Sequence, residues 1–178
     1  IRIYPTDSQP AITPLLHNQP PALANPRFVL DVHLGRLARY LRLLGFDTLY
    51  RNDYDDPTLA EISASEQRIL LSCDIKLLTR KQVVYGYFVR SRKPSRQILE
   101  VSRRYRLNRY PQPLDRCIDC NGIIHAVNKL DILDQLQPLT RKHYDEFFQC
   151  DRCHKIYWEG SHYQKMQTLI EKLKTDAD

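Results

Sequence analysis

Between residues 27 and 106, the spacing of apolar residues changes repeatedly from strand-like to helical. Short apolar runs that suit buried strands stand at residues 27–31, 46–50, 68–72 and 87–90. Helical spacing or helix-start signals fill the segments between and after them, at residues 33–45, 57–67, 75–82 and 94–106. Alternating strands and helices of these lengths predict an α/β fold with a parallel sheet in three layers.

Two of the predicted helices show a clear amphipathic pattern or clear signals at their ends. In the helix at residues 33–45, one face carries Leu34, Leu37, Leu41 and Leu44. The opposite face carries Arg36, Arg39 and Arg42, and we expect it to be solvated. Gly45 stands where a helix C-terminus favours a left-handed residue. Asp56 followed by Pro57 predicts an N-cap and a first-turn proline for the next helix.

The two ends of the chain differ from this middle part. Six of the eleven prolines fall within residues 1–26, a spacing that favours an extended strap over a helix. The opening IRIYP is strand-like and does not begin with Met, so we expect residues 1–26 to be the end of an upstream domain followed by a linker. Paired cysteines, short strands and a closing helix from about Ser161 predict a separate unit at residues 113–178, after an α/β domain at residues 27–112.

Four of the five cysteines form two pairs, each separated by two residues, with 29 residues between the pairs: Cys117, Cys120, Cys150 and Cys153. Two such knuckles supply the four thiolates of a closed tetrahedral zinc site. Two disulfides would explain the same count, but an intracellular chain disfavours them. We therefore predict a structural zinc ion, with His154 as a less favoured substitute ligand.

Carboxylates follow the predicted strands. Asp31 ends the first apolar run, Asp74 follows the third, and the acidic loop that contains Asp53 and Asp56 follows the second. Because parallel strands end at one edge of a sheet, these side chains are expected at a common carboxyl edge, where open α/β sheets place their sites. Clustered carboxylates suit Mg²⁺ or Mn²⁺, which can activate water in phosphodiester cleavage. Helix capping is the alternative role for each of them.

The charge distribution indicates a polyanionic partner. The whole chain carries a net charge of +6, but residues 76–109 contain eleven basic residues and one acid, a net charge of +10. Tyrosines are interleaved with these charges, a combination that suits single-stranded nucleic acid. A solvated basic face is the alternative. The expected RNA contacts are Arg36, Arg80, Lys81, Arg92, Lys93, Arg96, Arg103 and Arg104.

Composition excludes several other classes. The five glycines are too far apart for a phosphate-cradling loop, which excludes Walker-type and dinucleotide-binding motifs. No apolar run approaches the roughly 18 residues of a membrane span, and no signal peptide is recognisable. The mean hydropathy of −0.52 is typical of a soluble globular protein. We therefore expect a cytoplasmic protein without a membrane partner.

Taken in order, residues 28–53, 68–81, 86–90, 117–122 and 150–163 resemble the Mut-seven C-terminal ribonuclease domain family, and the similarity extends from about Arg27 to Ile170. The resemblance implies a PIN-like nuclease fold joined to a zinc ribbon, and metal-dependent cleavage of RNA. By motif, it assigns Asp31 and Asp74 to the family's acidic positions. Asp56 is the preferred third ligand, with Asp53 and Glu61 as further candidates.

The sequence departs from the family pattern at one position. The family usually has Arg before the acidic residue at the end of the third strand, whereas this chain has Cys73. The departure puts phosphate binding beside the metal in question, unless Arg80 substitutes. Bacterial members of the family often carry an upstream ubiquitin-like domain, and the opening IRIYP resembles the last strand of one. The expected partner is RNA, with tRNA and the ribosome as candidates.

Three functions therefore remain in competition. A metal-dependent ribonuclease explains the acidic edge, the basic stretch and the cysteines together. A non-catalytic protein that binds RNA or the ribosome explains the last two, with the aspartates as helix caps. A zinc-ribbon protein that binds DNA leaves the acidic edge unexplained.

Overall fold

A computed structural model of the chain describes residues 25–110 and 115–160, together with Thr168 and Glu171. We call residues 25–110 the α/β unit and residues 115–160 the cysteine unit. The α/β unit contains, in chain order, β1 (Phe28–Leu30), the 3-10 helix η2 (Val32–Leu34), α1 (Gly35–Leu43), β2 (Thr48–Leu49), α2 (Asp56–Ser65), β3 (Ile69–Ser72), α3 (Ile75–Leu78), β4 (Gly86–Phe88), α4 (Pro94–Tyr105) and the 3-10 helix η3 (Leu107–Arg109).

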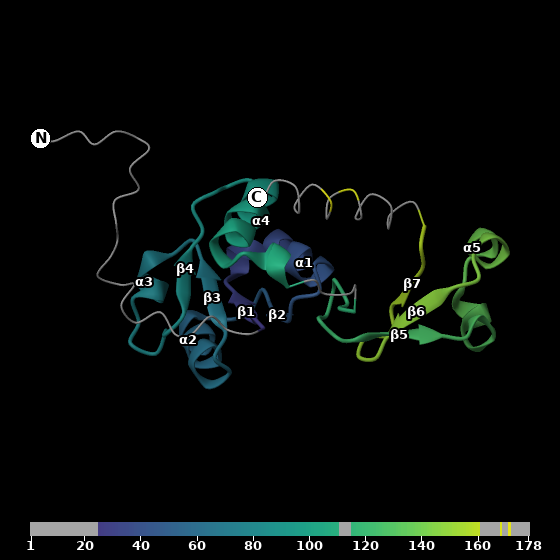
Figure 1. The fold of residues 1–178 in the computed structure, drawn as a ribbon. Helices are drawn as coiled ribbons and strands as arrows, with labels where there is room; N and C mark the ends of the chain where they lie inside the picture. The colour runs from purple at the N-terminus through teal and green to yellow at the C-terminus, as the bar shows by residue number, and fades with distance from the viewer. Residues whose placement is uncertain (1–24, 111–114, 161–167, 169–170, 172–178) are drawn as a thin grey trace, which may run out of the picture.

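The four strands of the α/β unit form a parallel sheet in the order β2-β1-β3-β4. Phe28 of β1 lies opposite both Thr48 of β2 and Ile69 of β3, so the first residues of these three strands are in register. The predicted alternation of strands and helices around a parallel sheet is thereby confirmed. Strands β2 and β4 are the edges (Figure 1).

Helices contact both faces of this sheet because successive strand residues point in opposite directions. Phe28 and Leu71 belong to the larger core, where α1 and α4 supply residues such as Leu41 and Ile98. Val29 lies on the other face, in a smaller core with residues of α2 and α3. Figure 1 shows α2 and α4 on opposite sides of the strands.

Two expectations about this unit are corrected. Arg42 does not lie on a solvated face of α1: it is 3% exposed, and it donates hydrogen bonds to main-chain carbonyls. The N-cap of α2 is Asp55 and not Asp56, because the Asp55 carboxylate accepts the N–H of Thr58 at 2.9 Å. Gly45, with a φ of 85°, follows α1 as the sequence predicts.

The cysteine unit is built on a second, antiparallel sheet. It contains β5 (Ile124–Val127), the 3-10 helix η4 (Lys129–Gln135), α5 (Pro138–His143), β6 (Phe147–Cys150) and β7 (Ile156–Tyr157), and its strand order is β5-β6-β7. Its apolar core is small, with Ile132, Leu136 and Phe147 as the buried members. In Figure 1 the end that carries α5 projects away from the α/β unit.

A polar junction joins the first cysteine knuckle to the α/β unit. The guanidinium of Arg42 donates to the carbonyl oxygens of Thr48, Ile118 and Asp119, at 2.9, 3.2 and 2.7 Å. The N–H of Thr48, on edge strand β2, donates to the side-chain oxygen of Asn121 at 2.9 Å. The knuckle and Arg42 together therefore occupy the N–H and the carbonyl of Thr48 on this edge strand.

Several expectations fall outside the described residues. These are the strand-like IRIYP and proline-rich strap at residues 1–24, and the expected boundary between the two units, at residues 111–114. Most of the predicted closing helix from Ser161 also lies outside, although Thr168 and Glu171 are helical. None of the helices in the described part of the chain is both long and apolar enough to span a bilayer.

Candidate functional site

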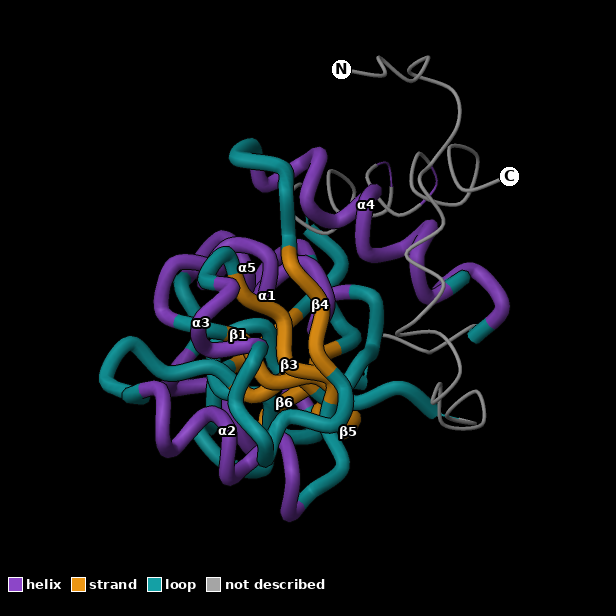
Figure 2. Tube along the Cα trace, turned by 90° about the vertical axis from the view of Figure 1, so that its left-hand side faces the viewer, coloured by secondary structure: helices purple, strands orange, loops and turns teal. Residues whose placement is uncertain are grey.

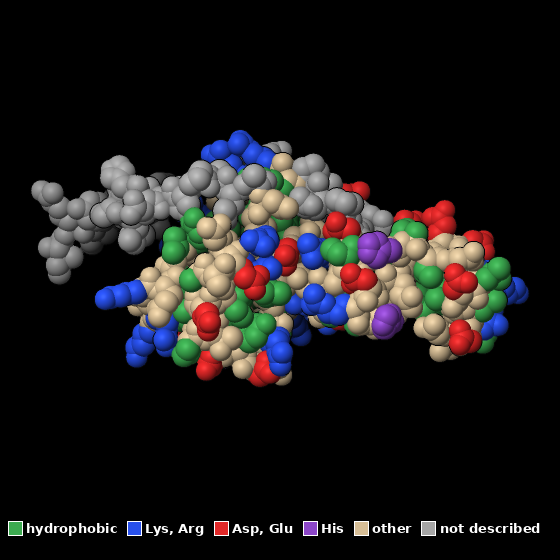
Figure 3. All heavy atoms as spheres, turned by 90° about the horizontal axis from the view of Figure 1, so that it is seen from below, with side chains coloured by type: hydrophobic (Ala, Val, Ile, Leu, Met, Phe, Trp, Pro, Cys, Tyr) green, Lys and Arg blue, Asp and Glu red, His purple; other side chains and the backbone are tan. Residues whose placement is uncertain are grey.

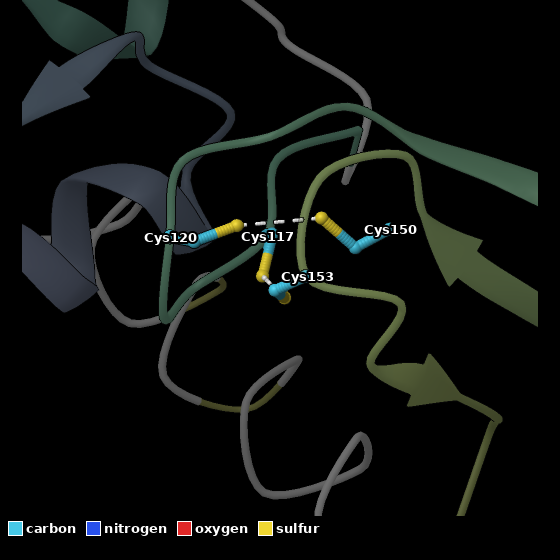
Figure 4. Close-up of side chains that lie close together, drawn as sticks. All are labelled: Cys117, Cys120, Cys150 and Cys153. Atoms are coloured by element: carbon cyan, nitrogen blue, oxygen red, sulfur yellow. Dashed lines mark hydrogen bonds between the residues drawn. The ribbon is translucent and has the colours of Figure 1, made fainter.

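The four paired cysteines meet at one point between the two knuckles. Their sulfur atoms all lie within 4.8 Å of one another, with 3.6 Å between Cys117 and Cys153 and 3.4 Å between Cys120 and Cys150 (Figure 4). Two sulfurs bound to one zinc ion lie about 3.8 Å apart, whereas a disulfide bond is about 2.05 Å long. The separations therefore fit a single tetrahedral metal ion and not two disulfides. His154 does not belong to this group.

The backbone of each knuckle is shaped for this approach. The N–H groups of Gly122 and Arg152 point at the sulfurs of Cys120 and Cys150, each at 3.4 Å. A Cβ on Gly122 would lie 2.7 Å from the Cys150 sulfur, so glycine is required where the two knuckles touch. Asn121 and His154 adopt left-handed backbone conformations at equivalent places in the two turns.

A tyrosine outside the quartet supports one of the ligands. The Tyr157 hydroxyl lies 3.0 Å from the Cys117 sulfur. Burial opposes ionisation of Cys117, yet this hydrogen bond and nearby main-chain N–H groups lower the pKa of its thiol to about 7. Burial and the neighbouring thiols raise the pKa of Cys120 to about 12. A bound cation would favour the ionised form of these thiols, so the four sulfur donors suit zinc, which takes thiolate ligands.

Asp31 lies at the carboxyl edge of the parallel sheet, buried and fully engaged. One carboxylate oxygen accepts the N–H of His33 at 2.8 Å, which caps η2. The other accepts the Ser72 hydroxyl and the N–H of Cys73, the latter at 3.0 Å. Asp31 therefore ties the end of β1 to the end of β3, across the two central strands.

Asp74 lies beside it and shares the same serine. The N–H of Asp74 donates to the Ser72 hydroxyl oxygen at 2.8 Å, while its carboxylate accepts the N–H of Lys76 at 2.7 Å and caps α3. Ser72 thus links the Asp31 carboxylate to the main chain of Asp74. The two aspartates follow neighbouring strands, and each carboxylate caps the helix that comes after it, which is the role considered as the alternative.

The other acidic candidates have different partners. Asp56 forms an ion pair with Arg80 at 3.5 Å, and Asp53 forms one with Arg51 at 2.6 Å. Glu61 lines a shallow depression on α2 together with Arg80. In the described part of the chain, Asp31, Asp56 and Asp74 do not form a group of ligand atoms close enough for one ion, as the cysteines do.

Sequence reasoning missed two residues at this edge. Ser72 is the polar end of an otherwise apolar strand, which is the signal that could have identified it. Glu100, the single acid of the basic stretch, accepts the N–H groups of Arg90 and Ser91, both at 2.9 Å. Cys73 lies between these residues: burial, then Asp31 and Glu100, raise the pKa of its thiol, so it stays protonated at neutral pH.

The residues expected to contact RNA are all exposed, and they fall into separate places: Arg36, Arg80, Lys81, Arg92, Lys93, Arg96, Arg103 and Arg104. Lys93 is the N-cap of α4 and Arg104 lies in its last turn, which separates them by about 16 Å along the helix. Seen from the α2 side, basic and acidic side chains are interspersed (Figure 3). The basic residues at positions 76–109 therefore do not form one uniform face.

A comparison with protein families gives one match. A family model described as the Mut7-C RNAse domain matches residues 26–170, which is most of the chain and includes both units. No match was found among curated proteins or among solved structures.

Proposed function

Because the chain belongs to the Mut7-C RNAse domain family, we propose that it is a metal-dependent ribonuclease that cleaves RNA phosphodiester bonds at the carboxyl edge of its parallel sheet. The observation that carries this proposal is the position of Asp31 and Asp74 at the ends of the neighbouring strands β1 and β3, where Ser72 connects the Asp31 carboxylate to the main chain of Asp74. The fold is proposed to be PIN-like, because helices cover both faces of the four-stranded sheet.

Oxygen donors of this kind fit Mg²⁺ or Mn²⁺. When bound, such an ion would activate water and stabilise the charge that develops on the phosphate. Asp31 and Asp74 would hold it, with Ser72 orienting the Asp31 carboxylate and the N–H of Lys76 orienting that of Asp74. Asp56 would join them only after its ion pair with Arg80 opens. Cys73 takes no part as a nucleophile, because its thiol stays protonated.

The remaining residues would bind the substrate and stabilise the fold. The exposed arginines and lysines at the start of α4 follow β4 directly, so they lie at the same edge as the aspartates and would hold RNA phosphates there. The cysteine site would hold structural zinc, with all four positions filled by the protein. Free thiols in this number suit a reducing compartment, which supports action in the cytoplasm. The proposed partners are RNA, such as tRNA or ribosomal RNA, and an upstream ubiquitin-like domain.

The proposal is tested by an activity assay on labelled RNAs with Mn²⁺. We expect wild-type protein to cleave, and Asp31→Asn and Asp74→Asn to lose at least about a hundredfold in rate, an effect in the range for removing one stabilising group. RNA affinity in the absence of Mn²⁺ should change little. Asp131→Asn, an exposed position on η4, is the matched control and should cleave like wild type.

Two results would overturn the proposal. If wild-type protein with Mn²⁺ leaves varied RNAs intact but binds them, the chain is a non-catalytic RNA-binding protein, and the two aspartates act as helix caps. If both aspartate variants cleave as well as wild type, the activity resides elsewhere. Because Asp31 is buried and accepts three hydrogen bonds, the exposed Asp74→Asn keeps the test decisive when Asp31→Asn is unstable.

A further inference from the structure

The outer edge of the parallel sheet carries two arginines on a single tyrosine ring. Tyr87 lies on edge strand β4, half-buried, with no further strand outside it among the described residues. The guanidinium carbons of Arg90 and Arg104 lie 5.9 and 6.0 Å from the centre of its ring. Figure 2 views the sheet from the side of this strand. Residues from the end of β4 and from the last turn of α4 therefore meet at one point.

Glu100 holds this arrangement chiefly through hydrogen bonds from the main chain and from Tyr87. Its carboxylate accepts the N–H groups of Arg90 and Ser91 and the hydroxyl of Tyr87, at 2.9, 2.9 and 3.0 Å. Burial opposes its ionisation, but the main-chain hydrogen bonds lower its pKa, so it stays charged. The Arg90 guanidinium reaches it only at 4.0 Å. The carboxylate is thus engaged mainly by main-chain and hydroxyl donors, with one long ion pair to Arg90.

The arginine pair lies next to the proposed catalytic edge. The N–H of Val89 donates to the Ser72 carbonyl at 2.8 Å, and the Cys73 thiol lies 3.4 Å from the Val89 carbonyl. Arg90 is the next residue, while Ser72 bonds to Asp31 on the other side. A phosphate bound by Arg90 would therefore lie near the aspartates, at the same ends of the strands.

We propose that Tyr87, Arg90 and Arg104 form a subsite that binds a backbone phosphate of single-stranded RNA adjacent to the cleavage position. The inference rests on the proposed function and adds to it the substrate class. Both arginines are exposed and lie against the same ring, and guanidinium groups match phosphate oxygens bidentately. The aromatic ring beneath them suits an unpaired nucleotide, whose base is free to stack.

The test measures binding of a short fluorescein-labelled oligouridylate by anisotropy, without added Mn²⁺ and in an Asp74→Asn background, so that cleavage does not interfere. We expect Arg90→Gln/Arg104→Gln to weaken binding at least about tenfold and to reduce the salt dependence by about 1.4 log units per log unit of salt, the value for two lost single-strand contacts. Arg141→Gln/Lys142→Gln removes two exposed charges from α5 and should change the affinity less than about twofold, because α5 lies in the cysteine unit.

Substitutions of the tyrosine separate the ring from its hydroxyl. Tyr87→Phe keeps the ring and should bind like wild type, whereas Tyr87→Leu should weaken binding about 5- to 100-fold, the range for lost stacking. The same variants should affect a duplex RNA of equal length less than the single strand. Millimolar inorganic phosphate should not displace the oligouridylate, because the subsite is proposed for the RNA backbone and not for free phosphate.

Several outcomes would overturn the subsite. These are a wild-type salt dependence in Arg90→Gln/Arg104→Gln, equal losses on single-stranded and duplex RNA, or displacement of the oligouridylate by millimolar phosphate. The nuclease proposal fails by a different result. If the subsite variants lose binding while wild-type protein never cleaves RNA, the subsite stands and the nuclease proposal falls. If wild-type protein cleaves and the double variant binds normally, the reverse holds.

Discussion

The α/β unit and the cysteine unit owe their structure to different interactions. In the α/β unit, apolar residues are buried on both faces of a four-stranded sheet, with Phe28, Leu30 and Leu71 fully enclosed. The apolar core of the cysteine unit has only Ile132, Leu136 and Phe147 as its buried members. A core of that size does not offset the conformational entropy of the 46 described residues at 115–160. The comparison indicates that burial stabilises the first unit, whereas the second would need a bound metal ion.

The junction shows that the two units are not independent. The Arg42 guanidinium and the Asn121 side chain are buried, and they connect β2 with the first knuckle through hydrogen bonds to main-chain groups. Asn121 also donates to Asp47 at 2.8 Å, and Asp47 is paired with the buried Arg68. Loss of the knuckle would leave these polar groups without partners. Unfolding of the cysteine site should therefore destabilise the edge strand β2 of the α/β unit.

The largest expected effect comes from removing the metal. Structural zinc contributes about 10–16 kcal/mol in small zinc-binding peptides, far more than this unit's apolar core. Zinc analysis of purified protein should give one ion per chain, and Cys150→Ser should lose it and unfold residues 115–160. Hydrogen exchange should show the core strands β1 and β3 still protected, with the Thr48 N–H exposed. Equal and simultaneous loss of protection in both units would contradict the distinction between them.

A truncation in the apolar core is expected to destabilise the α/β unit and to leave the metal site of the cysteine unit intact. Leu71→Ala removes a fully buried side chain from the central strand and should lower the free energy of unfolding of the α/β unit by about 3 kcal/mol. Zinc content should remain at one ion per chain. Denaturant unfolding followed together with metal release measures both quantities, and early zinc release in this variant would show that the cysteine unit depends on the α/β core.

Breaking the junction should have a smaller and more local effect. Arg42→Leu leaves buried carbonyl oxygens without a donor and should cost about 2–3 kcal/mol. Arg39→Gln, a neighbour on α1 whose side chain is 57% exposed and paired with Asp119, should cost less than about 1 kcal/mol. If the two variants unfold at the same denaturant concentration, the junction contributes no more than a surface ion pair.

The smallest expected effect is a change in acid stability. Burial opposes ionisation of Asp47, but hydrogen bonds from Arg68 and Asn121 keep its pKa below the ordinary value. A carboxyl group with a lowered folded-state pKa stabilises the protein above its unfolded pKa of about 4, and this contribution is lost as the pH falls through the folded value. Asp47→Asn should therefore be less stable than wild type at pH 6, with the difference shrinking below about pH 4. A difference independent of pH would contradict this assignment.

The sequence by itself determined the order of the elements, the parallel sheet and the cysteine quartet. Buried runs such as residues 68–72 and the spacing of Leu34, Leu37 and Leu41 are local patterns, and local geometry suffices to read them. The two knuckles are equally local, because residues three apart in a tight turn present their thiols together. The positions of Asp31 and Asp74 at one edge followed from the same reasoning, since parallel strands end on the same side.

Only the tertiary structure decided which polar residues turn inward. Arg42 has the spacing of a solvated face, yet β2 and the first knuckle cover it, and their carbonyl groups supply its partners. Glu100 lies within a basic helix but faces the main-chain donors that follow β4. Asp55 and Asp56 are adjacent, and the choice of the cap depended on one turn of backbone. These residues acquire their roles from segments distant in sequence or from exact backbone angles, and the periodicity of a single chain contains neither.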